Sequence, residues 1–335
     1  MKLFKLPGER IIKTAIAIFI TAWICNLLNW PAVFAVITAT VTIEPTVSDS
    51  IRKGIIRFPA SAIGSAYTVL FISLFGNSPI TYTLAAFFTI TTCYQLRLHA
   101  GLLVATLTAI AMIEVVHDHY LIAFFIRLGT TTIGLLVSTA VNFFVLPPNY
   151  KQEIKNNLQG MSKQAGNIIE SIFSSLLLDK QSNHFDQKLT KKLKQKIEQT
   201  EKLIQFQEDE ARLHPLLGID AEIFQSLKQK LSYFNLIQYH LKNLANPALK
   251  NINFTNEEKQ IIMTAVDVLA NNIRHVTAIN LNEHNQQLNN LMKLYWEKTE
   301  TFQTTTNQHP IYFPPELMLL YELLSIYNLA MKIHE

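Results

Sequence analysis

The sequence predicts an all-α chain: a six-span transmembrane helix bundle followed by a cytoplasmic helical bundle. Charge is uneven along the 335 residues, because residues 1–150 carry 9 Lys or Arg and 5 Asp or Glu, whereas residues 151–335 carry 20 of each kind. Six apolar runs lie in the first part, and the second part alternates apolar and polar residues at helical spacing. We therefore expect a transmembrane domain over residues 1–148 and a cytoplasmic domain over residues 149–335.

Each predicted span is a mostly apolar run, since about 20 such residues cross the hydrocarbon core of a bilayer. The runs are Ile11–Leu28, Ala32–Ile43, Phe58–Phe75, Pro79–Leu96, Leu98–Val116 and Tyr120–Leu146. Three turns without Lys or Arg alternate with basic connections. The turns are Asn29–Pro31, Gly76–Ser78 and His117–His119, and the basic residues are Lys2, Lys5, Arg10, Lys13, Arg52, Lys53, Arg57, Arg97, Lys151 and Lys155. The positive-inside rule then places both termini in the cytoplasm.

Small and hydroxyl-bearing residues recur along the predicted spans. Four-residue spacing of small side chains favours close helix packing, either within one subunit or between two. The stripes are Gly101, Ala105 and Ala109, then Ala60 with Gly64, and Gly134 with Ser138. The many threonines are expected to bond carbonyls of their own helices, and a polar-lined path is the alternative.

Two ionisable side chains in the last two spans are candidates for a substrate pathway. Arg127 lies seven residues after Tyr120, ~10 Å along a helix that rises 1.5 Å per residue. Glu114 lies near the end of the preceding span, so the two are expected at similar depth. They form either a structural ion pair or a functional pair, in which Arg127 presents its fork to a substrate carboxylate and Glu114 is its counter-ion or a proton carrier. Extension of Arg127 to the membrane surface is a third interpretation, and Lys13 and Arg57 are expected to extend inward in that way.

The second predicted span is short and ends at Glu44-Pro45, so these two residues are also candidates. Proline disfavours helix in the residue before it, and a broken helix is a common feature of transporter binding sites. The alternative is a plain cytoplasmic helix end with Glu44 among the lipid headgroups. The phrases 39–44 and 109–114 both end in Ile-Glu, which suggests an inverted repeat that would place Glu44 and Glu114 in equivalent positions.

The tail is predicted to form five or six helices. Helical periodicity covers residues 223–244, 257–279, 288–302 and 315–333, and Thr255 three residues before Glu258 is typical of a capping box. Breaks are expected at Pro215–Gly218 and at Asn246-Pro247. The lysines of residues 188–196 are interpreted as a solvated helix face, with a lipid-binding face as the alternative.

Several function classes lack their signatures. The sequence contains no G-x-x-x-x-G-K-[ST] or G-x-G-x-x-G loop and no G-x-S-x-G elbow, so no enzyme activity is predicted. His117 and His119 alone make a poor metal site, and neither a metal nor a cofactor is expected. The excess of basic residues belongs to the predicted membrane part, so nucleic acid is not an expected partner.

Three phrases carry a resemblance to a known family. They are Arg10–Ala17, Val41–Thr46 with Lys53-Gly54 following, and Phe144–Pro148. On these residues the chain resembles the bacterial aromatic acid exporters related to fusaric acid resistance proteins, in a short branch with a C-terminal helical domain. Where related exporters have Gln, this chain has Glu44. The resemblance implies export of aromatic or other organic acid anions, coupled to the proton gradient, from the bacterial cytoplasmic membrane, and it implies a homo-oligomer because larger relatives carry two membrane halves.

The sequence therefore supports two hypotheses about function. In the first, the chain is a secondary exporter whose partners are the lipid bilayer and a small organic acid, with Arg127, Glu114, Glu44 and Pro45 on the pathway. In the second, the spans anchor an interaction or regulatory module that acts through the cytoplasmic tail, because the tail is long for a transporter.

Overall fold

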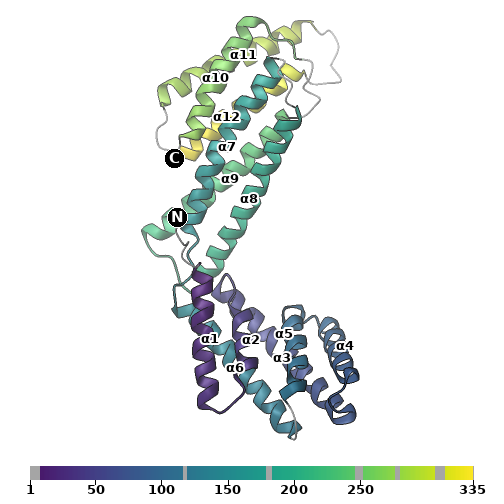
Figure 1. The fold of residues 1–335 in the computed structure, drawn as a ribbon. Coiled ribbons are helices and arrows are strands. Elements are labelled where there is room, and N and C mark those ends of the chain that lie inside the picture. The colour runs from purple at the N-terminus through teal and green to yellow at the C-terminus, as the bar shows by residue number, and fades with distance from the viewer. Residues whose placement is uncertain are drawn as a thin grey trace, which may run out of the picture. The chain divides into compact units, whose positions relative to one another are not determined.

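A computed structural model of the chain describes residues 8–115, 119–178, 183–245, 252–275, 280–305 and 314–334. Within these ranges the chain forms twelve α-helices and no strand, which confirms the predicted all-α class (Figure 1). The chain divides into two compact units. The first comprises the described residues of Met1–Asn149 together with Phe206–Pro215, and the second comprises those of Tyr150–Gln205 and Leu216–Glu335.

The first unit contains one helix for each predicted apolar run. These helices are α1 (Glu9–Leu27), α2 (Ala32–Thr42), α3 (Val47–Phe75), α4 (Pro79–Gln95), α5 (His99–Val115) and α6 (Tyr120–Phe144). Helix α3 begins well before the predicted span, at Val47 instead of Phe58. Its polar first turns are stabilised locally, because Thr46 caps the helix and Arg52 pairs with Asp49 at 2.9 Å.

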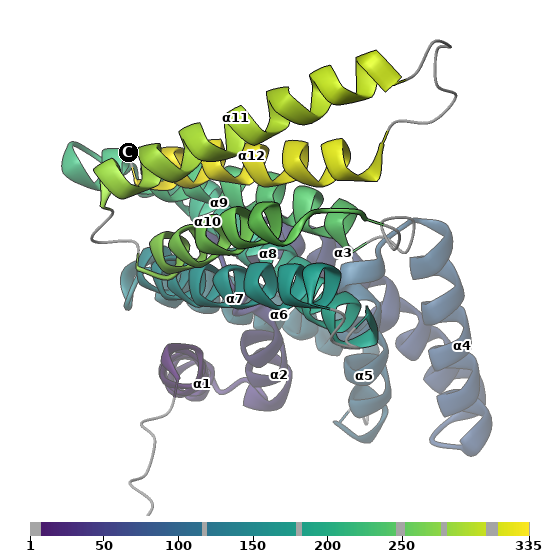
Figure 2. The ribbon, with the colours of Figure 1, turned by 90° about the horizontal axis from the view of Figure 1, so that it is seen from above.

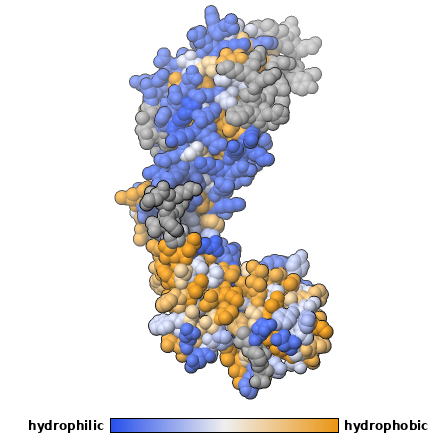
Figure 3. Space-filling model, in the orientation of Figure 1, coloured by the Kyte–Doolittle hydropathy of each residue, from blue (hydrophilic) through white to orange (hydrophobic). Residues whose placement is uncertain are grey.

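The surface of the first unit suits a lipid environment. Helices α1, α3 and α6 are long and apolar enough to cross a membrane, and α2 and α5 are shorter apolar helices. Large apolar side chains face outward, among them Phe19, Leu121 and Phe125, and Figure 3 shows apolar residues over much of this unit. At 11 residues, α2 rises ~16 Å, about half the thickness of a hydrocarbon core. The six-span layout remains a prediction.

Close helix packing inside the first unit follows the predicted small-residue stripes. A Cβ atom built on Gly64 would lie 2.8 Å from the carbonyl oxygen of Ala105 in α5, and one on Gly134 would lie 2.5 Å from that of Ala35 in α2. Only glycine permits such an approach of two backbones. The stripes thus form seams within one subunit. Threonines bond their own helices as expected, with Thr38 donating to the carbonyl of Phe34 at 2.9 Å.

The second unit is a bundle built from α7 (Lys151–Leu177), most of α8 (Asn183–Ala211), α9 (Ile219–Leu244), α10 (Asn256–Arg274), α11 (Leu281–Thr305) and α12 (Pro315–His334). Helix α7 packs against α9 and α10, and α11 lies beside α12 (Figure 2). Phe173, Phe234 and Tyr327 are fully buried in its core. The predicted capping box is confirmed at Thr255 and Glu258. The predicted break at Asn246-Pro247 lies outside the described residues.

Candidate functional site

The helical structure is interrupted between α2 and α3, and we call this connection the α2–α3 break. Helix α2 ends at Thr42 and α3 begins at Val47, so four residues that include Pro45 separate two helices. The Thr46 side chain accepts a hydrogen bond from the backbone N–H of Asp49 at 3.1 Å and caps α3. The interruption that the sequence predicts at this place is therefore present.

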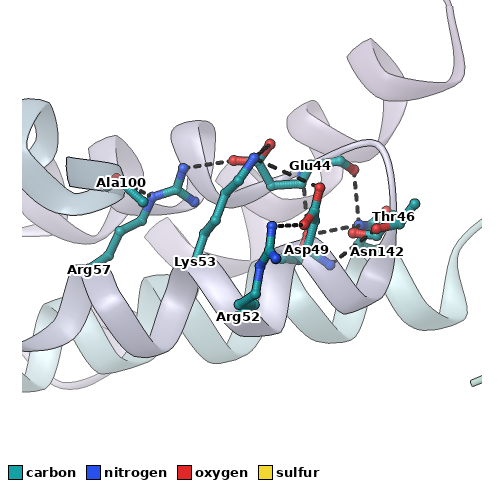
Figure 4. Close-up of polar contacts among 9 residues, drawn as sticks. Glu44, Thr46, Asp49, Arg52, Lys53, Arg57, Ala100 and Asn142 are labelled. Carbon is teal, nitrogen blue, oxygen red and sulfur yellow. Dashed lines mark hydrogen bonds and ion pairs between the residues drawn. The ribbon is translucent and has the colours of Figure 1, made fainter. Parts of the chain in front are cut away.

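Glu44, in this break, forms ion pairs with two cationic side chains of α3 (Figure 4). One carboxylate oxygen lies 2.7 Å from Nη2 of Arg57, and the other lies 2.9 Å from Nζ of Lys53. Arg57 is 5% exposed and also donates from Nε to the carbonyl of Ala100 at 3.2 Å. Its Nη1 has no hydrogen-bond partner among the described residues. One carboxylate thus balances a buried guanidinium that still has an unused donor.

Asn142 of α6 joins this cluster to two other segments. Its Nδ2 lies 2.9 Å from the hydroxyl of Ser50 and 3.1 and 3.3 Å from the carbonyls of Glu44 and Thr46. Its Oδ1 accepts from the ammonium of Lys13 in α1 at 3.0 Å. The break therefore holds α1, α3 and α6 together through one amide side chain. Buried polar groups of this kind stabilise a structure only when they are paired.

Residues 206–215 add a carboxylate to the first unit. Glu210 is 2% exposed in its side chain, and one of its oxygens accepts from the backbone N–H of Val47 at 3.1 Å. The other oxygen lies 2.8 Å from Nδ1 of His214, whose ring centre lies 4.4 Å from that of Phe143. An anion at the first turn of a helix meets free N–H groups and the positive end of the helix dipole. Glu210 therefore stabilises the start of α3.

Arg127 in α6 is 1% exposed. Its Nη1 donates to the hydroxyl of Thr131 at 2.5 Å, and that hydroxyl lies 3.1 Å from the hydroxyl of Ser61 in α3. The guanidinium carbon lies 4.8 Å from the centre of the Phe34 ring. Nε and Nη2 have no hydrogen-bond partner among the described residues. Unpaired donors of a buried cation cost free energy, so this side chain suits an anion that accepts from both.

The expected ion pair between Glu114 and Arg127 does not form. Glu114 is exposed and accepts a hydrogen bond from the hydroxyl of Tyr82 in α4. Helix α5 packs against α3 and α4, whereas α6 packs against α1, α2 and α3. Two helices that are neighbours in the sequence are therefore not the pair that packs together, and the Arg127 side chain meets α2 instead.

Sequence reasoning missed several residues of this site. Lys13 and Arg57 were expected to extend to the inner surface, but both are buried with partners inside the protein. Asn142 and Glu210 were not singled out. An amide in an otherwise apolar span was a usable signal for Asn142, because such a group needs partners there. Nothing local to Glu210 indicates that it contacts α3.

A groove of about 530 Å³ lies along α3 and α6. Its lining is apolar apart from Thr132 and Thr139, and Phe58 and Leu135 are among the residues that form it. None of the four predicted pathway residues is in this lining. Arg127 and Glu44 belong to the buried interior and not to the groove.

His117 and His119, the two histidines considered as metal ligands, lie in the predicted turn at residues 117–119. Residues 117 and 118 lie outside the described ranges. Within the part of the chain that the structure describes, no group of three or more His, Cys, Asp or Glu side chains could hold a metal ion. Cys25 and Cys93 are buried free thiols.

Comparison with known proteins identifies the family of this chain. The family model described as aromatic acid exporter family member 1 matches residues 5–145, which include α1–α6. The chain is similar over nearly its whole length to UPF0421 proteins of Oceanobacillus iheyensis (44% identical, 98% of this chain and 96% of the relative) and Staphylococcus haemolyticus (38%, 97% and 98%). A UPF0421 protein of Bacillus thuringiensis is 38% identical over 98% of this chain and 93% of its own length.

The chain belongs to the family of these UPF0421 proteins, and its α1–α6 region matches the aromatic acid exporter family. It is therefore a membrane protein of a transporter family, with a lipid bilayer as its environment.

Proposed function

We propose that the chain is a secondary exporter of aromatic or other organic acid anions across the bacterial cytoplasmic membrane. In this proposal α1–α6 are six spans, both termini are cytoplasmic, and the chain works as a homo-oligomer. Family membership and the buried cations of α1, α3 and α6 support it. A helical domain over residues 149–335 follows on the cytoplasmic side.

The observation that carries the proposal is the environment of Arg127. Two guanidinium nitrogens that have no partner among the described residues offer a carboxylate two parallel hydrogen bonds. The guanidinium lies over the face of the Phe34 ring, whose edge supplies an apolar contact for the ring of an aromatic acid in this proposal. A buried cation attracts an anion more strongly than an exposed one, because the local dielectric constant is low. Arg127 therefore binds the substrate carboxylate in this proposal.

Glu44 and Pro45 are the second element of the proposed pathway. The ion pairs of Glu44 with Arg57 and Lys53 depend on an ionised carboxylate. Protonation of Glu44 would remove both ion pairs, which hold α3 against the α2–α3 break. Uptake of a proton therefore drives part of the transport cycle in this proposal. Glu114 is proposed as a further pathway residue near the other end of the unit.

Efflux from proteoliposomes tests the role of Arg127. Proteoliposomes loaded with benzoate should lose it through the parent protein, and Arg127→Leu should abolish this efflux while the protein still inserts. Arg52→Leu is the matched control, since that arginine is exposed and pairs with Asp49 in the same helix. Efflux by Arg127→Leu equal to that of the parent would remove Arg127 from the pathway. A growth screen of a deletion strain against a panel of weak organic acids would identify the substrate class.

A second candidate function is regulation through the tail, and Glu210 favours it. This residue follows the long helical segment of the second unit, yet its carboxylate caps α3. A deletion strain complemented with the Arg127→Leu chain separates the two functions. Full rescue by that chain would mean that the spans only anchor the tail, whereas loss of rescue supports export.

A further inference from the structure

Helices α2 and α3 share a sequence pattern with α5 and α6. Nine identities recur at one spacing of seventy residues, and they include both glutamates and both buried arginines. The pairs are Ala35 and Ala105, Thr38 and Thr108, Ala39 and Ala109, Ile43 and Ile113, Glu44 and Glu114, Ile56 and Ile126, Arg57 and Arg127, Ile63 and Ile133, and Gly64 and Gly134. A shared spacing over thirty residues indicates a duplicated unit and not a chance phrase.

Helices α1 and α4 extend the duplication, with a spacing of sixty-eight residues. Ala17, Thr21 and Cys25 line the buried face of α1, and Ala85, Thr89 and Cys93 line that of α4, all with 0% exposure. The turns after the two helices are also alike. The N–H of Trp30 bonds the carbonyl of Cys25 at 2.9 Å, and that of Leu98 bonds the carbonyl of Cys93 at 2.8 Å.

Helix packing follows the same duplication, in which α1, α2 and α3 form the first copy and α4, α5 and α6 form the second. Helix α1 packs on α2 as α4 packs on α5, α3 packs on α5 as α6 packs on α2, and α1 packs on α6 as α4 packs on α3. The two copies meet where α3 crosses α6, and there Ser61 bonds Thr131, its own equivalent at the seventy-residue spacing. Because each copy has three helices, the second copy runs through a membrane in the opposite direction under the proposed six-span layout.

The two copies differ in the pairing of their charges. In the first copy Glu44 lies 2.7 Å from its arginine, Arg57. In the second copy Glu114 bonds Tyr82, and Arg127 keeps two nitrogens without a partner among the described residues. One arginine of the repeat is thus paired with a carboxylate, and the other has two donors that no carboxylate of the described residues accepts from.

We propose that Arg57 and Arg127 are two copies of one carboxylate-binding site, occupied in alternation. In each copy the glutamate of the same repeat competes with the substrate carboxylate for the guanidinium. The chain as described has the first site closed by Glu44 and the second open. Exchange of the two conformations between the repeats gives the opposite state, in which Glu114 pairs with Arg127 and Arg57 is open to the substrate. This inference deepens the proposed function and rests on it for the identity of the anion.

The exchange requires Glu114 to approach α6 as Glu44 approaches α3. Glu44 lies 2.9 Å from Lys53, and the residues that correspond to this pair are Glu114 and Ala123. A cross-link between Glu114→Cys and Ala123→Cys, made with a short bis-maleimide that replaces the length of the Glu and Lys side chains, therefore reports the opposite state in a Cys25→Ala/Cys93→Ala background. Its formation rate in the full chain needs neither a substrate nor transport.

Loss of the Glu44 carboxylate should favour the opposite state. We expect Glu44→Gln to raise the rate of cross-linking about tenfold, the change that ~1.4 kcal/mol produces. Asp49→Asn is the matched control, because that carboxylate pairs mainly with Arg52, at 2.9 Å against 3.9 Å from Lys53, and should leave the rate unchanged. The exchanged pair Glu44→Arg/Arg57→Glu keeps the ion pair and should also leave it unchanged. An equal rate in Glu44→Gln and the parent overturns the alternation.

Binding of benzoate, measured by calorimetry on the purified chain, tests whether the two arginines are equivalent. Arg127→Leu should abolish binding, and adding Glu44→Gln to that variant should restore it by opening Arg57. No recovery in the double variant overturns the inference even when efflux by the parent depends on Arg127. Conversely, faster cross-linking in Glu44→Gln without any efflux by the parent supports the repeat and contradicts the proposed exporter function.

Discussion

Nη2 of Arg57 lies 2.7 Å from Oε1 of Glu44, although the two residues lie on opposite sides of the N-terminus of α3. Both side chains are largely removed from solvent, with 6% and 11% exposure. Neither charge is stable there alone, because removal of one partner from a buried ion pair leaves an uncompensated charge. The pair therefore fixes the position of the α2–α3 break.

Glu44→Leu is expected to lower the free energy of unfolding by ~3–5 kcal/mol, the usual effect of leaving a buried charge unpaired. Arg57→Leu should have a similar effect, since Glu44 would keep only Lys53. The double variant should lose much less than the sum, because the buried guanidinium and its carboxylate are both gone, and Lys53 is partly exposed and still lies 3.9 Å from Asp49. Thermal unfolding in detergent, analysed as a double-mutant cycle, measures this coupling. Additive losses would show that the two side chains act independently.

Gly134→Ala is expected to destabilise the first unit by ~1–3 kcal/mol, as overpacking does. The new Cβ would lie 2.5 Å from the carbonyl oxygen of Ala35, so α2 and α6 would have to separate. Gly54→Ala is the matched control, because its Cβ would meet only Leu135 at an ordinary 3.7 Å. That change should be neutral or should stabilise by up to ~1 kcal/mol through helix propensity. Equal unfolding temperatures for the two variants would contradict the proposed seam.

The sequence predicts the helices and the packing stripes, because both depend on local spacing. Runs of apolar residues mark α1–α6, and Gly64 and Gly134 mark the helix seams. The partners of charged residues depend instead on tertiary packing. Lys13 and Asn142 are 129 residues apart along the chain, and no local pattern joins them. The expected pairing of Glu114 with Arg127 was wrong because it assumed that helices consecutive in the sequence also pack together.

Glu210→Ala should loosen the start of α3. The substitution leaves the N–H of Val47 without its carboxylate acceptor, and loss of such a buried partner costs ~1–3 kcal/mol. Hydrogen exchange in the full chain should therefore become faster in the first turns of α3. Glu210→Gln retains an acceptor oxygen and should lie between the parent and Glu210→Ala. Asp209→Ala is the control, because Asp209 is more exposed and lies 3.7 Å from Arg212. Equal exchange in all variants would contradict a role of residues 206–215 in the first unit.

The stability of the tail should fall as the pH drops below about 6.5, the ordinary pKa of histidine. Burial lowers the pKa of His284, which lies 3.2 Å from the amide of Asn272 and against the ring of Tyr327. His334 lowers this pKa further by charge repulsion. A histidine with a lowered pKa stays neutral in the folded chain but takes up a proton when the chain unfolds. The unfolded state therefore gains stability as the pH falls through its own pKa, and the folded state does not.

Hydrogen exchange in α10–α12 of the full chain, compared at pH 7.5 and 5.5 after correction for the intrinsic exchange rate, measures this effect. The parent should show lower protection at the acidic pH, and His284→Gln, which cannot titrate, should show a smaller difference. His275→Gln is the matched control, since His275 is exposed. A parent whose protection is the same at both pH values would mean that His284 does not destabilise the tail in acid. A pH response that survives in His284→Gln would assign the effect to other groups of the tail.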